Sequence, residues 1–127
     1  MIITHCKATK YNIKLKKPFS YNLATLEYLP YVLIRMETDK GIVGWGEAAI
    51  GWDTTGEMQN GSLEIFEFIK PILLESRIEN IDDIMKALGD INKIIYENTA
   101  LKSGIEMAML DILGKYIAKI VKQQMER

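Results

Sequence analysis

The stretch GIVGWGEAAIG, residues 41–51, decides the fold. Val43, Trp45 and Glu47 alternate with glycine and small residues, which predicts a strand with large side chains on one face and almost none on the other. A bare face lets another backbone approach closely. We therefore expect a packing partner on this face, which is either a helix of the chain itself, a ligand or another domain.

Two further strands are predicted before this one. Residues 2–16 alternate in polarity and change face once, which predicts a bulge near Thr9 or Lys10 or, alternatively, fraying at the terminus. Residues 31–38 alternate again, and Gly41 predicts a tight reversal into the third strand. Residues 18–30 carry two prolines and many apolar side chains, so we expect a long loop that covers either the chain's own core or a substrate.

The apolar period changes from two to about 3.6 after residue 51, which predicts helices. The first is expected to begin with a capping box formed by Thr54 and Glu57 and to end near Ser76. The second is expected to open at Asn80, and the third to run from about residue 99 to 123. The sequence thus predicts one α+β domain over residues 1–127, a three-stranded antiparallel meander followed by a bundle of about three helices.

The composition excludes several classes of function. A formal net charge of −1 over 127 residues gives no reason to expect nucleic acid or a membrane as partner. Cys6 and His5 are the only residues of their types, so the chain offers neither a disulfide nor a zinc cluster. A lone cysteine is typical of a reducing compartment, and we expect a cytoplasmic protein.

Carboxylates are the only plentiful side chains suited to catalysis. The candidates are Glu47, Asp53, Glu57, Glu106 and Asp111. None of them forms a recognised catalytic spacing, and Glu47 lacks the second group that acid/base chemistry or a metal site requires. We expect no catalytic residue and no metal ligand in this chain.

The order of these features resembles the N-terminal capping domain of the enolase superfamily, in its mandelate racemase and muconate-lactonizing branch. That branch includes muconate cycloisomerases, dipeptide epimerases and o-succinylbenzoate synthases. The resemblance extends from residue 2 to about residue 116. The matching segments are Lys17–Phe19, Val32–Arg35, Gly41–Ala48 and Ser103–Lys115.

The resemblance implies an active site shared between two domains. In such enzymes a β/α barrel supplies magnesium carboxylates and lysines that remove a proton beside the carboxylate of a small substrate, and the capping domain closes over it. Trp45 and Glu47 are then expected at an interface. The resemblance implies that the substrate-capping loops contain Phe19, Tyr21, Leu23, Ile50, Trp52 and Asp53.

The barrel sequence does not follow in these 127 residues, so we expect the chain alone to be inactive and to bind no magnesium itself. Two alternatives remain open. One is a self-associating interaction module, because apolar side chains such as Phe19, Trp45 and Trp52 would otherwise be exposed. The other is a subunit completed by a separately encoded barrel.

Overall fold

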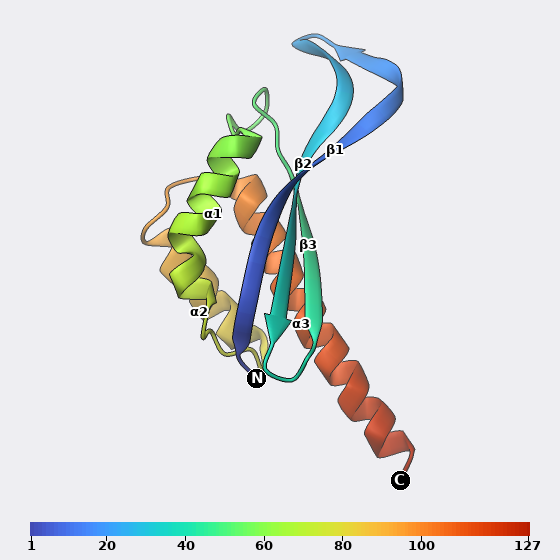
Figure 1. Cartoon of the computed structure of the whole chain (residues 1–127), viewed down its shortest axis with the longest axis vertical. Coiled ribbons are helices and arrows are strands. Elements are labelled where there is room, and N and C mark those ends of the chain that lie inside the picture. The colour runs from blue at the N-terminus through green and yellow to red at the C-terminus, as the bar shows by residue number, and fades with distance from the viewer.

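The computed structural model describes residues 1–127 and consists of three strands followed by three helices (Figure 1). The strands pair antiparallel in the order β1-β2-β3, which confirms the predicted meander and the α+β class. Their bounds are β1 Ile3–Tyr21, β2 Ala24–Thr38 and β3 Val43–Ala49. The helices are α1 Gln59–Leu73, α2 Ile81–Asn92 and α3 Thr99–Met125.

The predicted loop over residues 18–30 is wrong, because β1 and β2 continue through it as a long hairpin. Phe19 pairs with Leu26, and Tyr21 pairs with Ala24 across a two-residue turn. Both prolines lie where a strand can lack a backbone N–H group. Pro18 lies in an edge strand where the register shifts, and the carbonyl of Pro30 accepts from Ile50 N at 3.0 Å just beyond the end of β3.

The predicted bulge near Thr9 or Lys10 is also wrong. The register of β1 against β2 shifts between Ile3 and His5 and again between Lys14 and Phe19. The first shift lets Ile3 and Cys6, three residues apart, both face the core. No register shift separates Ala8 from Tyr11, so Tyr11, Ile13 and Leu15 lie on the face of β1 opposite to that of Cys6 and Ala8, and this produced the change of face in the sequence.

One face of the sheet forms the core with the helices. Val32, Ile34 and Met36 of β2 are fully buried against them. Cys6 is buried beside these residues, and its burial raises the pKa of its thiol to about 11. The thiol is therefore protonated near neutral pH, which agrees with an ordinary structural role for this residue.

The partner of the bare face of β3 is α3. A Cβ atom on Gly46 would overlap the carbonyl oxygen of Gly104, and one on Gly44 would overlap that of Ala108. Gly104 in turn lies against Ala48. The small residues that alternate along residues 41–51 therefore allow α3 to pack with its backbone against the backbone of β3. A helix of the chain itself was one of the possibilities that the sequence left open.

The start of α1 differs from the prediction. The helix begins at Gln59, because the side chains of Thr54 and Thr55 donate to Gly51 O and close a turn instead of capping a helix. The helix also ends earlier than expected, at Leu73, two residues after Pro71. The predicted cap of α2 is confirmed, since Asn80 Oδ1 accepts from Asp83 N at 2.9 Å.

Two side chains of α3 cover the outer edge of β3. Asp111 Oδ2 accepts from Trp45 N at 2.9 Å, and Lys115 Nζ donates to Val43 O at 2.7 Å. The two side chains also pair with each other at 2.8 Å. Desolvation opposes ionisation of Asp111, but the hydrogen bonds from Lys115 and Trp45 and the charge of Lys115 outweigh it and hold the pKa of this carboxyl below its usual value.

We expect Asp111→Asn to lower the free energy of unfolding by about 1 kcal/mol at pH 7, since the bonds are charge-assisted but the pair is partly exposed to solvent. A lowered folded-state pKa contributes stability above the unfolded value of about 4, and this contribution is lost as the pH falls through the folded value. Urea titrations at pH 7 and pH 3 should therefore show the difference between wild type and variant shrinking at acid pH. The control is Asp90→Asn, which removes exposed pairs with Lys86 and Lys93. A difference that is equal at both pH values would contradict a lowered pKa of Asp111 in the folded protein.

Candidate functional site

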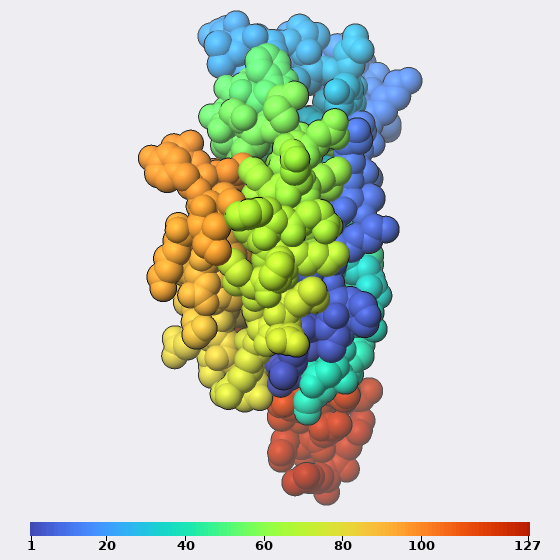
Figure 2. Space-filling view, turned by 60° about the vertical axis from the view of Figure 1, so that its left-hand side comes forward, coloured from blue at the N-terminus to red at the C-terminus, as the bar shows by residue number.

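Two segments that are distant in sequence form a cavity of about 300 Å³ at the hairpin end of the molecule. The hairpin contributes one wall, and the segment after β3 contributes the other. Figure 2 shows the hairpin and the segment leading into α1 side by side at this end. Five of the six residues that the resemblance assigned to capping loops line the cavity: Phe19, Tyr21, Ile50, Trp52 and Asp53.

The sixth residue, Leu23, lies outside the cavity. It occupies the hairpin turn, and 69% of its surface is exposed. Phe19 and Tyr21 precede this turn on β1, and their rings stack with centroids 6.0 Å apart. The tip of the hairpin is thus an exposed apolar projection beside the cavity.

The base of the hairpin is fixed by Gln59, the first residue of α1. Its Nε2 donates to Asn12 Oδ1 at 2.7 Å and to Tyr31 O at 3.0 Å. One side chain therefore joins both strands of the hairpin to the helix. No pattern in the sequence indicates this contact, because the partners lie up to 47 positions away.

The second wall is a compact turn. The backbone nitrogens of Thr54, Thr55 and Gly56 all donate to Gly51 O, and Gly56 has a φ of 77°, which favours glycine. Ile50 is buried at the start of this turn, whereas Trp52 is 54% exposed. The turn therefore anchors one apolar side chain in the core and presents another at the rim of the cavity.

One residue of the cavity wall, Tyr21, carries an unsatisfied polar atom. The hydroxyl of Tyr21 is buried and has no hydrogen-bond partner in the chain. A buried hydroxyl without a partner costs free energy unless a ligand or a second domain supplies one. The lining is thus mostly apolar, and its polar side chains are Tyr21, Tyr31, Asp53 and Thr54.

The candidate carboxylates do not come together. Glu57 is buried at the start of α3, where it accepts from Ala100 N at 2.9 Å and Leu101 N at 3.0 Å. Asp111 is engaged at the edge of β3, and no group of three histidine, cysteine or acidic side chains in the chain is arranged to hold a metal. The residues present therefore do not fit a magnesium ion.

The two residues assigned to an interface lie on the face of the sheet away from the core. Trp45 is 45% exposed and has the Arg35 guanidinium over its ring at 5.8 Å. Glu47 is exposed beside the same strand edge, near Ser103 and Met107 of α3. Neither residue lines the cavity at the hairpin end.

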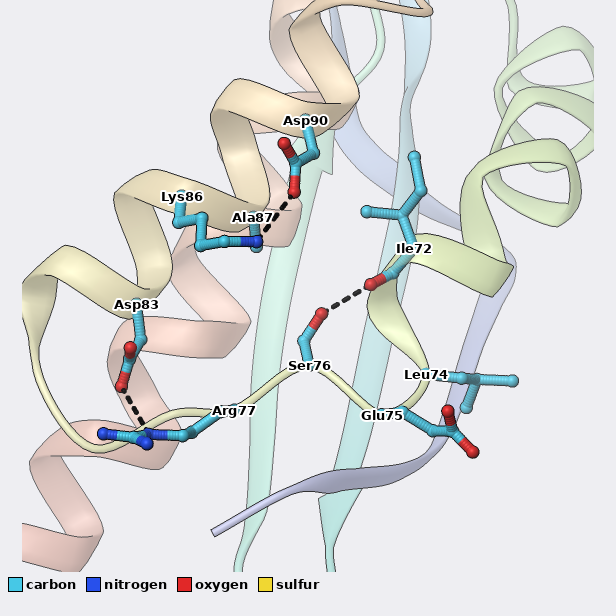
Figure 3. Close-up of a pocket in the computed structure, with 9 residues that line it drawn as sticks. All are labelled: Ile72, Leu74, Glu75, Ser76, Arg77, Asp83, Lys86, Ala87 and Asp90. Carbon is cyan, nitrogen blue, oxygen red and sulfur yellow. Dashed lines mark hydrogen bonds and ion pairs between the residues drawn. The ribbon is translucent and has the colours of Figure 1, made fainter.

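A larger cavity of about 530 Å³ lies between the end of α1 and α2 (Figure 3). Four of its charged side chains already pair with one another. Lys86 contacts Asp90 at 3.3 Å, and Arg77 contacts Asp83 at 3.7 Å. With these groups paired, the cavity is a less favourable candidate site than the one at the hairpin. None of the helices is both long and apolar enough to cross a membrane.

Residues 3–125 match the family described as mandelate racemase / muconate lactonizing enzyme, N-terminal domain. The chain is 32% identical over 111 residues to the hydrophobic dipeptide epimerase of Enterococcus faecalis, covering 87% of this chain and 30% of that enzyme. It is 35% identical over 102 residues to muconate cycloisomerase 1 of Acinetobacter baylyi, covering 78% of this chain and 27% of that enzyme.

Solved structures agree with these sequence matches. The dipeptide epimerase from Enterococcus faecalis, in complex with Mg and the dipeptide L-Leu-L-Tyr, superposes with a TM-score of 0.85 at 31% identity. That superposition covers 92% of this chain and 32% of the other. The chain thus spans about a third of the length of the relatives it matches.

Proposed function

Because the chain belongs to the mandelate racemase and muconate lactonizing enzyme family, as its N-terminal domain, we propose that it closes over the active site of a β/α barrel and contacts the distal part of a small carboxylate substrate. The observation that carries this proposal is the cavity, in which the hairpin and the turn after β3 bring Phe19, Tyr21, Ile50, Trp52 and Asp53 together. These residues lie in two separate segments, and no core requirement explains the exposure of Phe19 and Trp52.

The chemistry of the cavity favours a partly apolar group. Its walls are mainly aromatic and aliphatic, so they would bury the side chain of a dipeptide or a comparable carbon skeleton. The Tyr21 hydroxyl would find its missing partner in a polar atom of that group or of the barrel. Most of the relatives that are epimerases have names that specify a dipeptide, which supports a dipeptide over a muconate as the substrate.

The proposal assigns no reacting group to this chain. Magnesium binding and proton transfer would belong to the barrel, since the residues present here do not fit a metal site. The contribution of this domain would be to orient the substrate and to exclude water from the reacting carbon. Accordingly, the 127-residue chain with Mg²⁺ should show no turnover of dipeptides above an empty-vector control.

A chimera tests the capping role. Residues 1–127 replace the N-terminal domain of the Enterococcus faecalis epimerase, and kcat and KM are measured for hydrophobic dipeptides. We expect Trp52→Ala to lower kcat/KM about tenfold, chiefly through KM, because it removes a contact to a part of the substrate that does not react. Tyr21→Phe should act in the same direction if its hydroxyl bonds the substrate.

The matched control is Phe68→Ala. Phe68 is 65% exposed on α1 and does not line the cavity, so kcat/KM should stay at the value of the unsubstituted chimera. Equal kinetics for Trp52→Ala and Phe68→Ala would contradict the capping role. Turnover by the isolated chain would refute the assignment of all catalytic groups to the barrel.

A further inference from the structure

Helix α3 is apolar on two opposite sides. The core side carries Leu101, Ile105, Met109 and Ile112, all fully buried. The opposite side carries a second row spaced by three and four residues, which we call the outer stripe. It consists of Met107, Leu110, Gly114, Ile117, Val121 and Met125.

The outer stripe faces solvent along its whole length. Ile117 and Val121 are each about half exposed, at 50% and 51%, and Met125 is 82% exposed. The C-terminal turns of α3 project beyond the rest of the molecule (Figure 1). Spacing by three and four is the pattern by which one helix packs along another helix.

The charges beside the outer stripe are arranged in a complementary way. Glu106 and Arg127 lie on one flank, and Asp111 and Lys122 lie on the other. Both pairs of positions are symmetric about one point, between Tyr116 and Ile117. An antiparallel copy of α3 with its two-fold axis at this point would place Glu106 opposite Arg127 and Asp111 opposite Lys122, each twice.

These charges are available for such contacts. Neither Glu106 nor Arg127 forms an ion pair within the chain. Lys122 has one exposed contact, with Glu126 at 4.0 Å. Asp111 uses Oδ2 for both of its contacts, with Trp45 N and Lys115 Nζ, so Oδ1 remains free.

The same axis suits the apolar side chains. Ile117 would meet its own copy at the axis, and Gly114 would lie opposite position 119, between Ile117 and Val121 of the second copy, where the absence of a side chain allows close approach. We propose that the outer stripe of α3 binds a second copy of this chain as an antiparallel, two-fold symmetric helix pair. The interaction is independent of the proposed capping role, because the cavity lies at the opposite end of the molecule (Figure 1).

Sedimentation of the 127-residue chain over a range of concentrations tests the pairing. The wild type should shift from one chain of 14.5 kDa to twice that mass. Ile117→Lys should weaken the dimer at least about tenfold, because two lysines would face each other at the axis. Phe68→Lys, an equally large change on exposed α1, should dimerise like wild type, and a wild type that remains monomeric would overturn the proposal.

A charge exchange tests the register. Glu106→Arg should weaken the dimer about threefold to tenfold, because it places like charges opposite each other twice. Adding Arg127→Glu to the same chain should restore the affinity. A double variant that is no tighter than Glu106→Arg would exclude this register, whatever the effect of either substitution on the monomer.

Cysteine cross-linking tests the orientation. Ile117→Cys should form a disulfide-linked dimer on mild oxidation, because antiparallel pairing brings this position next to itself. Leu110→Cys should not, since its two copies would lie roughly 20 Å apart along the helices. The native Cys6 is buried and serves as an internal negative control. Equal cross-linking at both positions would indicate a parallel pair and overturn the proposal.

Discussion

Replacing Gly46 with alanine should lower the free energy of unfolding by about 3 kcal/mol or more, which is the upper range for overpacking a tightly packed site. The new Cβ would overlap Gly104 O and would also lie 2.9 Å from Ala108 N. Both neighbours are backbone atoms of a helix, so no side chain can rotate away. The only relief is a displacement of α3 from β3, which would loosen the packing around Ile105 and Ala108.

Chemical denaturation with urea measures this effect, and Gly89→Ala is the matched control. Gly89 lies inside α2, and a Cβ added there would meet no atom within 4 Å. The same substitution at this position should raise stability by about 0.5–1 kcal/mol, because alanine favours the helix. A Gly46→Ala protein as stable as wild type would contradict the backbone contact between β3 and α3.

Replacing Glu57 with alanine should cost about 2–3 kcal/mol, through loss of two charge-assisted hydrogen bonds and of a negative charge at a helix N-terminus. The Asn98 side chain makes no cap hydrogen bond, and its backbone has a φ of 54°, so α3 depends on Glu57 for its first amides. Truncation leaves Ala100 N and the buried Leu101 N without partners. Glu57→Gln should have a smaller effect, because its amide oxygen can still accept.

Amide hydrogen exchange localises the effect of Glu57→Ala. The amides of Ala100 and Leu101 should exchange faster in the variant, whereas amides in the middle of α3 should change only as far as global stability falls. Glu64→Ala, at an exposed position of α1, should alter stability by less than about 0.5 kcal/mol. Unchanged protection of Ala100 and Leu101 would show that Glu57 does not cap the helix.

The contrast between two caps shows where sequence reasoning succeeds. Asn80 caps α2 through a residue three positions away, so its role follows from local spacing and was predicted correctly. Thr54 and Glu57 have an equally good local spacing, yet Glu57 caps a helix that begins more than 40 positions later. The tertiary contact overrides the local signal, and nothing in the neighbourhood of Glu57 indicates it.

The candidate site, too, could be predicted only in part from the sequence. Alternation in residues 41–51 predicted the strand and its bare face, but the two prolines of residues 18–30 concealed a hairpin that is held by Gln59 and by pairing across its turn. The grouping of Phe19 with Trp52 came from the resemblance to a family and not from any periodicity. The missing hydrogen-bond partner of the Tyr21 hydroxyl depends on the three-dimensional structure, and no sequence pattern indicates it. The outer stripe of α3, by contrast, is readable in the sequence as a second row of spacing three and four.

The seating of α3 on β3 also has a consequence for biosynthesis. Trp45 and the side chain that covers its edge, Asp111, are 66 positions apart, so the bare face of β3 leaves the ribosome long before its partner. At a synthesis rate of roughly 5–20 residues per second, that face of the nascent sheet stays uncovered for about 3–13 s. During this interval the apolar strands are open to chaperones and to other nascent chains. The distance in sequence between β3 and the helix that covers it therefore sets the period in which the newly synthesised chain is most exposed to aggregation.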